Sequence, residues 1–159
     1  MTVRLSIQRR AWELHVHEYA ASVPGLVPVV KGNGYGFGRS VLHPVAAALA
    51  NRVAVGSIYE LDDIADGVTP IVLTPSLVAP PQPSSPTDPL NRLVPTVGSV
   101  THVAALAGWH GSVAVELRTS MRRHGVSPDH LNPIIAAAGP GSPNIPASSP
   151  TTPPNTRAG

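Results

Sequence analysis

Cysteine is absent from the 159-residue chain, and Lys31 is the only lysine among its 11 Lys and Arg residues. Without cysteine the chain forms no disulfide and no thiolate metal site. Aromatic residues make up only 4% of the chain, so its core must be built from Val, Leu, Ile and Ala. No apolar run approaches the roughly 20 residues that cross a membrane, and charges interrupt the N-terminal segment where a signal peptide would be apolar. We therefore expect a soluble cytoplasmic protein without membrane contact.

The charge pattern argues against nucleic-acid binding. The formal net charge is only +2, and the arginines are scattered apart from the pairs at 9–10 and 122–123. No basic stripe interleaved with aromatic residues, as nucleic-acid-binding surfaces have, occurs in the chain. His15 and His17 form a His-x-His pair, but residues two apart on a helix do not face each other, so we expect no metal site.

A change of composition divides the chain into two parts. Residues 139–159 consist mainly of Pro, Ser, Thr, Gly and Asn, with Arg157 as the one charged residue. Such a segment buries too little apolar surface to offset the entropy lost on folding. We expect one domain over residues 1–138 and a disordered tail over 139–159, either natural or read from a shifted frame.

Alternating helix and strand patterns predict an α/β fold. Short apolar segments predict five strands, at 26–30, 52–57, 70–74, 93–97 and 112–117. Helical spacing predicts five helices, at 6–21, 40–51, 59–65, 99–107 and 128–138. Ser40 and Ser99 are suited to cap two of these helices, and the proline-rich stretch 79–88 is expected to be a loop. The alternation favours parallel strand pairing.

Lys31 ends the first predicted strand and is followed by alternating glycines, in the segment Val-Val-Lys-Gly-Asn-Gly-Tyr-Gly-Phe-Gly at 29–38. An amine at the end of a buried strand is partly desolvated, which lowers its pKa and favours attack on an aldehyde. That is the chemistry of a lysine that forms a Schiff base. A glycine-rich strand end also serves as an ordinary tight turn, so the spacing alone leaves both interpretations open.

The segment at 29–38 resembles the lysine motif of the alanine racemase family, whose members use pyridoxal 5'-phosphate (PLP). In that family the lysine carries the cofactor and the tyrosine four residues later contacts its phosphate. The resemblance therefore implies that Lys31 is the catalytic lysine and that Tyr35 binds the phosphate. The loop amides of Gly36 and Gly38 would add phosphate contacts.

A second segment, Arg-Thr-Ser-Met-Arg-Arg-His-Gly at 118–125, is similar to the Asp-Thr-Gly-Met-x-Arg-x-Gly segment after the fifth barrel strand of the family. It departs from that pattern at its first and third positions. The resemblance implies that Arg123 hydrogen-bonds the phenolic oxygen of PLP and, with Met121, shapes the substrate site. Glu116 stands where many members have a carbamylated lysine, and its carboxylate would orient Arg123 by a charge-assisted hydrogen bond.

The resemblance covers residues 7–135 and implies both a fold and a function. The fold would be a partial (β/α)8 TIM-type barrel of about five parallel strands with helices. The function would be that of a PLP-dependent amino-acid racemase that interconverts L- and D-alanine for cell-wall precursor supply, as a homodimer or with a complementing C-terminal half. The later strands and the second base have no counterpart here, so we expect impaired activity of the chain alone.

Two other functions stay open. One is a catalytically silent module that binds or carries PLP. The other is a doubly wound nucleotide-binding domain, which is disfavoured because no Gly-x-Gly-x-x-Gly follows the first predicted strand.

Overall fold

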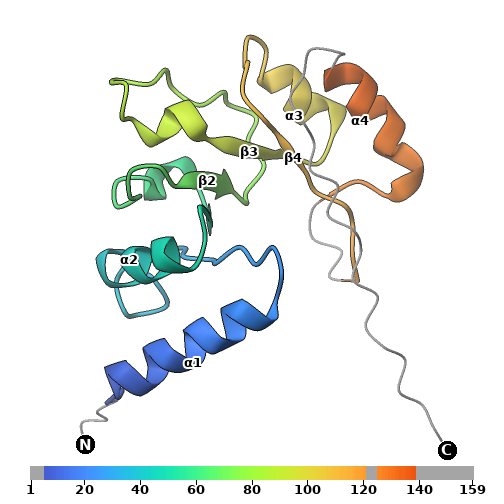
Figure 1. The fold of residues 1–159 in the computed structure, drawn as a ribbon. Coiled ribbons are helices and arrows are strands. Elements are labelled where there is room, and N and C mark those ends of the chain that lie inside the picture. Colours follow the sequence, from blue (N-terminus) through green and yellow to red (C-terminus); the bar gives the residue numbers. More distant parts are fainter. Residues whose placement is uncertain (1–5, 121–124, 139–159) are drawn as a thin grey trace, which may run out of the picture.

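The structure is a computed structural model that describes residues 6–120 and 125–138. Helices alternate with short strands along the chain (Figure 1). The α-helices are α1 Arg9–Ser22, α2 Arg39–Leu49, α3 Val100–Ala105 and α4 Leu131–Ala138. The strands are β1 Arg52–Val55, β2 Thr69–Val72, β3 Val94–Val97 and β4 Ala114–Val115. Short 3-10 segments are η1 Ile58–Glu60, η2 Pro89–Arg92 and η3 Pro128–His130. The predicted tail lies outside the described residues.

The four strands pair in parallel in the order β1-β2-β3-β4, which confirms the predicted parallel sheet. The predicted strand at 26–30 forms only an isolated parallel bridge between Val29 and Ala54. Two hydrogen bonds of 2.8 Å close it, from the amide of Val30 to Ala54 and from the amide of Ala54 to Pro28. Since Pro28 has no N–H of its own to donate, this segment does not extend into a full strand.

Four of the five predicted helices form close to their expected bounds. Ser99 caps α3 as predicted, because its hydroxyl accepts a hydrogen bond of 3.2 Å from the amide of His102. Ser40 does not cap α2, which begins one residue earlier and has Gly38 at its N-cap. The helix predicted at 59–65 is wrong, since only η1 forms there. A segment of that length gains few helical hydrogen bonds, and Glu60 instead binds backbone amides outside it.

The core consists of three small apolar clusters along the sheet. At the first, Ala46 of α2 packs with Val30 and Val53. At the last, Val97 and Ile134 join β3 to α4, and the middle cluster fills the space around β1 and β2. The pairs α1 with α2 and α3 with α4 accordingly lie at opposite ends of the sheet (Figure 1). Aliphatic side chains dominate these clusters, as the low aromatic content predicts.

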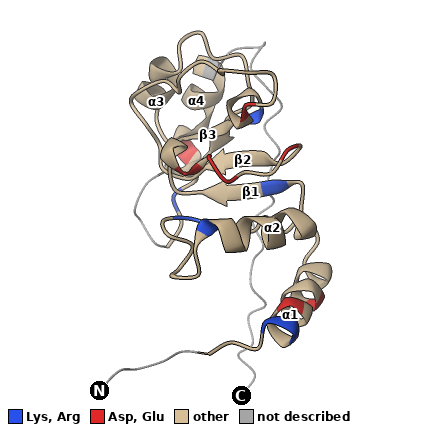
Figure 2. Cartoon of the chain, turned by 90° about the vertical axis from the view of Figure 1, so that its left-hand side faces the viewer, with Lys and Arg blue, Asp and Glu red and all other residues tan. Residues whose placement is uncertain are grey.

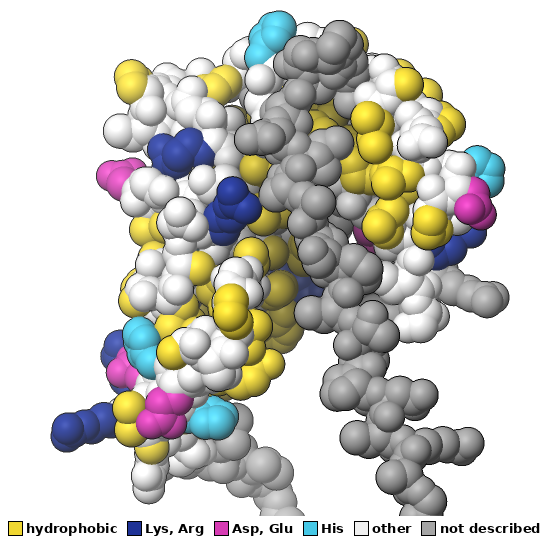
Figure 3. Space-filling model, turned by 45° about the vertical axis from the view of Figure 1, so that its right-hand side comes forward, with side chains coloured by type: hydrophobic (Ala, Val, Ile, Leu, Met, Phe, Trp, Pro, Cys, Tyr) yellow, Lys and Arg dark blue, Asp and Glu magenta, His cyan; other side chains and the backbone are white. Residues whose placement is uncertain are grey.

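The surface carries few charges and several exposed apolar side chains. Charged residues are spread over the elements, with both signs present (Figure 2). Apolar side chains gather in two areas of the face that Figure 3 shows. Within 6–120 and 125–138, no helix has the length and hydropathy of a membrane span, and no group of three or more His, Cys, Asp or Glu side chains is arranged to hold a metal.

Candidate functional site

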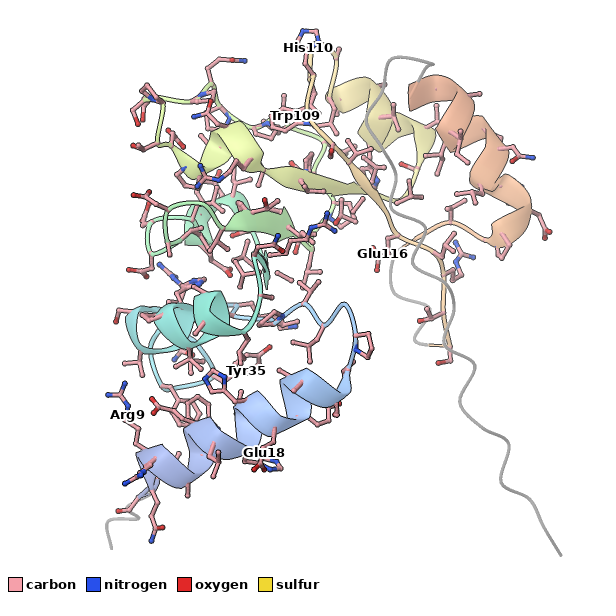
Figure 4. All side chains as sticks on the ribbon, in the orientation of Figure 1. Arg9, Glu18, Tyr35, Trp109, His110 and Glu116 are labelled. Carbon is pink, nitrogen blue, oxygen red and sulfur yellow. The ribbon has the colours of Figure 1, made fainter. Side chains whose placement is uncertain are left out.

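The carboxyl ends of the parallel strands meet at one edge of the sheet, and the described site candidates lie there. Lys31 follows the segment that bridges to β1, and Glu116 follows β4 directly. In parallel α/β folds the loops at this edge form ligand sites. The two residues stand at opposite ends of the strand order, and Figure 4 shows Tyr35 near α1 and α2 and Glu116 at the end of β4. The curvature of the sheet therefore controls how closely they approach.

Residues 31–38 form a compact loop that is closed by its own hydrogen bonds. The carbonyl of Lys31 accepts from the amide of Gly34 at 3.1 Å. Asn33 binds the loop twice, because its side-chain Oδ1 accepts from Gly36 and its carbonyl accepts from Gly38, both at 3.0 Å. The amides of Gly36 and Gly38, predicted as phosphate ligands, are thus already donated to Asn33. A phosphate bound by them would have to replace Asn33 as the acceptor.

The conformation of this loop explains its glycines. Gly34 has φ +66°, and a Cβ there would lie 2.7 Å from the carbonyl carbon of Gly38. Tyr35 has φ +54°, a conformation that bulky residues rarely adopt. Phe37 stacks on Trp12 of α1, with ring centroids 6.2 Å apart and an interplanar angle of 15°. Internal hydrogen bonds and the α1 contact therefore impose the loop conformation together.

Lys31 is exposed, and Tyr35 is 58% exposed. The partial desolvation expected for the Lys31 amine is therefore absent, because its segment forms only a bridge at the edge of the described sheet. Neither side chain has a hydrogen-bond partner within the described part of the chain. Both polar groups are consequently accessible to a ligand from the same loop.

Two charged side chains hold the backbone just after Lys31. Oε2 of Glu60 accepts from the amide of Gly32 at 3.1 Å and from the amide of Gly56 at 2.8 Å. Nη1 of Arg39 donates to the carbonyl of Gly32 at 3.2 Å. The sequence predicted Glu60 only as part of the helix at 59–65, and it did not single out Arg39. The one sequence feature that could have indicated this role of Glu60 is its position four residues after Gly56, the glycine that follows β1.

His43 of α2 is buried near these charges. It is 2% exposed, and its Nε2 has no hydrogen-bond partner among the described residues. Burial lowers the pKa of His43; the carboxylates of Asp63 and Glu60 act against this effect, and the guanidinium of Arg39 adds to it. Protonation of this imidazole is therefore less favourable in the folded chain than in water.

Glu116 lies at the base of the second motif. The segment after β4 returns on itself through a parallel bridge between Leu117 and Val126. The amide of Val126 donates to Glu116 at 2.9 Å, and the amide of Arg118 donates to Val126 at 2.8 Å. Gly125 has φ +92°, and a Cβ there would lie 2.7 Å from the carbonyl oxygen of Glu116. The two ends of the motif are thus fixed against each other.

The carboxylate of Glu116 is available for a further contact. The residue is half-buried, and its Oε2 is fully buried without a hydrogen-bond partner in the described ranges. Met121 and Arg123 lie outside the described residues. The contact between Glu116 and Arg123, and the roles of Arg123 and Met121 at the substrate, therefore stay predictions.

Comparison with known proteins identifies the family. A family model described as alanine racemase, N-terminal domain, matches residues 8–145. The chain belongs to this family. A crystal structure of alanine racemase from Corynebacterium glutamicum is similar to it, with a TM-score of 0.59 and 24% sequence identity over 80% of this chain. That likeness confirms the fold as part of a TIM-type barrel. No curated protein matches significantly.

This member of the alanine racemase N-terminal domain family corresponds to part of the full racemase. The match covers 38% of the Corynebacterium glutamicum chain. Parallel strands with intervening helices account for the likeness, because in a TIM-type barrel each such unit adds one strand and one covering helix.

Proposed function

We propose that this chain is the lysine-bearing part of a PLP-dependent racemase that interconverts L- and D-alanine, in the cytoplasmic supply of D-alanine for the cell wall. The observation that carries the proposal is the exposed Lys31 at the carboxyl edge of the sheet, in a chain of the alanine racemase N-terminal domain family. Tyr35 presents its hydroxyl from the same loop.

The described residues fit PLP. When bound, PLP supplies an aldehyde for attachment to an amine and an electron sink for the charge left by the departing α-proton. The exposed amine of Lys31 is accessible to the aldehyde, and the exposed hydroxyl of Tyr35 is free to donate to the phosphate. The buried Oε2 of Glu116 leaves an acceptor for Arg123, which we propose polarises the ring oxygen while Met121 borders the substrate.

Lys31 is also the proposed base. Its Nζ would take the α-proton on one face of the amino acid, while racemisation needs a second base on the opposite face. The chain spans 38% of the Corynebacterium glutamicum racemase, so we propose that the second base comes from a complementing C-terminal half, which would act across a dimer of the complemented protein. We accordingly expect low racemase activity for this chain alone.

A catalytically silent PLP-binding or carrier module is the second candidate. The short span relative to the racemase favours it, because attachment at Lys31 needs one amine whereas racemisation needs two bases. Both candidate functions predict that PLP attaches to Lys31. They differ in whether the protein then racemises alanine.

The first test maps the attachment site. The protein is incubated with PLP, reduced with borohydride, digested and analysed by mass spectrometry. We expect the cofactor mass on the peptide that contains Lys31 and its loss in Lys31→Ala. Because Lys31 is the only lysine, the terminal α-amino group is the single competing amine.

A relocated lysine provides the matched control. Arg10 is exposed on α1, so Arg10→Lys in the Lys31→Ala background offers an accessible amine away from the loop. We expect labelling of that peptide to be much weaker than labelling of Lys31 in the unmodified protein. Equal labelling at the two positions would contradict a built PLP site.

A further inference from the structure

Glu60 joins the loop that carries Lys31 to the end of the neighbouring strand. A single oxygen, Oε2, accepts from the amides of Gly32 and Gly56, residues that follow the bridging segment and β1. Oε1 lies 3.4 Å from the hydroxyl of Ser57. Hydrogen bonds to a carboxylate are shorter and stronger than those between neutral groups. One half-buried side chain thus ties two strand ends together at the edge where the site lies.

The peptide unit between Lys31 and Gly32 is held at both of its polar groups. Its N–H donates to Glu60 at 3.1 Å, and its C=O accepts from the amide of Gly34 at 3.1 Å. Its plane therefore cannot rotate without losing one of these bonds. Since the Cα of Lys31 borders this plane, the held plane restrains the direction of the Cα–Cβ bond from which the amine-bearing side chain extends.

Arg39 holds the next peptide unit from the other side. Its Nη1 donates to the carbonyl of Gly32 at 3.2 Å, and its Nε lies 3.4 Å from Oδ2 of Asp63. Glu60, with its negative charge, therefore binds the N–H of Gly32, and Arg39, with its positive charge, binds the carbonyl of the same residue. Gly32 has φ +59° and open space around the position of a Cβ, so contacts with these two residues restrain an otherwise flexible glycine.

The absence of a side chain at Gly56 leaves room for the carboxylate of Glu60. A Cβ at Gly56 would lie 2.8 Å from Oε1 and 3.1 Å from Oε2 of Glu60. A methyl group there would displace the carboxylate from the two amides. The glycine at the end of β1 is therefore needed for the carboxylate to sit where it does.

We propose that Glu60 is a positioning residue for Lys31, which orients the amine by holding the amides of Gly32 and Gly56. The inference rests on the proposed function, because it assigns Glu60 a role in the reaction of Lys31 with PLP. It acts through the backbone and has no contact with Lys31 Nζ among the described atoms. Displacement of a reacting group by about 1 Å can cost on the order of 100-fold in rate.

The test measures the contact and its consequence separately. Glu60→Ala removes both acceptor oxygens, Glu60→Gln keeps the shape without the charge, and Glu18→Gln changes an exposed carboxylate of α1 as the matched control. Amide hydrogen exchange of Gly32 and Gly56, followed by NMR, reports the contact without any cofactor. The rate of borohydride-trapped labelling of Lys31 by PLP reports positioning, and circular dichroism checks that each variant folds.

We expect faster exchange at both amides in Glu60→Ala, with labelling of Lys31 slowed by about 10- to 100-fold. Glu60→Gln should give an intermediate result, and Glu18→Gln should change neither measurement. If Glu60→Ala does not fold, Gly56→Ala carries the same test, because it displaces the carboxylate and leaves Glu60 in place.

Two results would overturn the role of Glu60, and a third would overturn the proposed function. Unchanged exchange in the Glu60 variants would show that the carboxylate does not hold the two amides. Faster exchange with unchanged labelling would show that it holds the loop without positioning Lys31. Protected amides in a protein that gives no adduct at Lys31 would overturn the proposed function instead, and with it the role of Glu60 in positioning.

Discussion

Single side chains organise the site through the backbone. Asn33 closes the Lys31 loop by accepting from two glycine amides, and Glu60 accepts from two more. Asn33 does this with two groups, its side-chain Oδ1 and its backbone carbonyl, whereas Glu60 does it with the single oxygen Oε2. Glycine-rich segments gain the most from such restraints, because glycine loses more conformational entropy on folding than any other residue.

His43 predicts how stability depends on pH. Burial lowers its pKa in the folded state, so below about pH 6.5 the unfolded chain binds more protons at this residue than the folded chain. Neutral, buried His43 therefore makes its full contribution to the free energy of unfolding above about pH 6.5. This contribution is lost as the pH falls from about 6.5 towards the lowered pKa of the folded state. Urea unfolding at a series of pH values should show this decline, and His43→Gln should reduce it.

An exposed histidine serves as the control for that measurement. His15 lies exposed on α1, and His15→Gln makes the same substitution at a surface position. A slope that is the same in the original protein and in His43→Gln would contradict a buried neutral imidazole.

At the scale of elements, α1 depends on the loop that it covers. None of its residues is buried, and its ring stack with the loop joins Trp12 to Phe37. Helices gain most of their stability from packing an apolar face against the rest of the protein. The stack therefore couples the position of α1 to the conformation of the Lys31 loop.

Trp12→Ala tests this coupling. We expect the free energy of unfolding to fall by about 0.5–1.5 kcal/mol for the lost ring pair, in addition to the loss of buried area. Urea unfolding gives the free energy, and hydrogen exchange should show faster exchange in the loop amides. Tyr19→Ala removes a ring that is 59% exposed on the same helix, and it should have a much smaller effect. Equal effects of the two changes would contradict the coupling.

At the scale of the whole molecule, Lys31 and Glu116 lie at opposite ends of the sheet, and a shared site requires that the two motifs come close together. Four interstrand spacings of about 4.8 Å separate their strands along the sheet, so only its curvature brings the two motifs across from each other. The TIM-type fold that the chain shares in part with a racemase provides such curvature.

The proposed single base predicts a specific activity for the chain alone. With PLP bound, Lys31 should exchange the α-hydrogen of L-alanine for solvent deuterium with little formation of D-alanine, because no second base protonates the other face. Proton NMR in heavy water follows the exchange, and an enzymatic D-alanine assay follows inversion. Lys31→Ala should abolish both signals. Absence of exchange in the original protein would favour the silent carrier, whereas racemisation at about 1 s⁻¹ or faster would contradict the need for a partner.

Local sequence patterns predicted much of this molecule because their causes are local. The apolar segments at 52–57 and 93–97 became strands, and Ser99 caps its helix, since each depends on neighbours in the chain. Pro28 lies within the segment that failed to become a strand, and its effect on pairing was visible in the sequence. The helix expected at 59–65 failed because Glu60 binds amides outside that segment.

By itself the sequence determined the family, the alternation of strands and helices, and the glycine loop around Lys31. Only the tertiary structure decided that Glu60 holds the amide of Gly32, 28 residues away, and that His43 is buried with no hydrogen-bond partner for its Nε2 within 6–120 and 125–138. It also decided that Lys31 is exposed. These features depend on which strand ends meet at the sheet edge, and that meeting results from the packing of the whole chain.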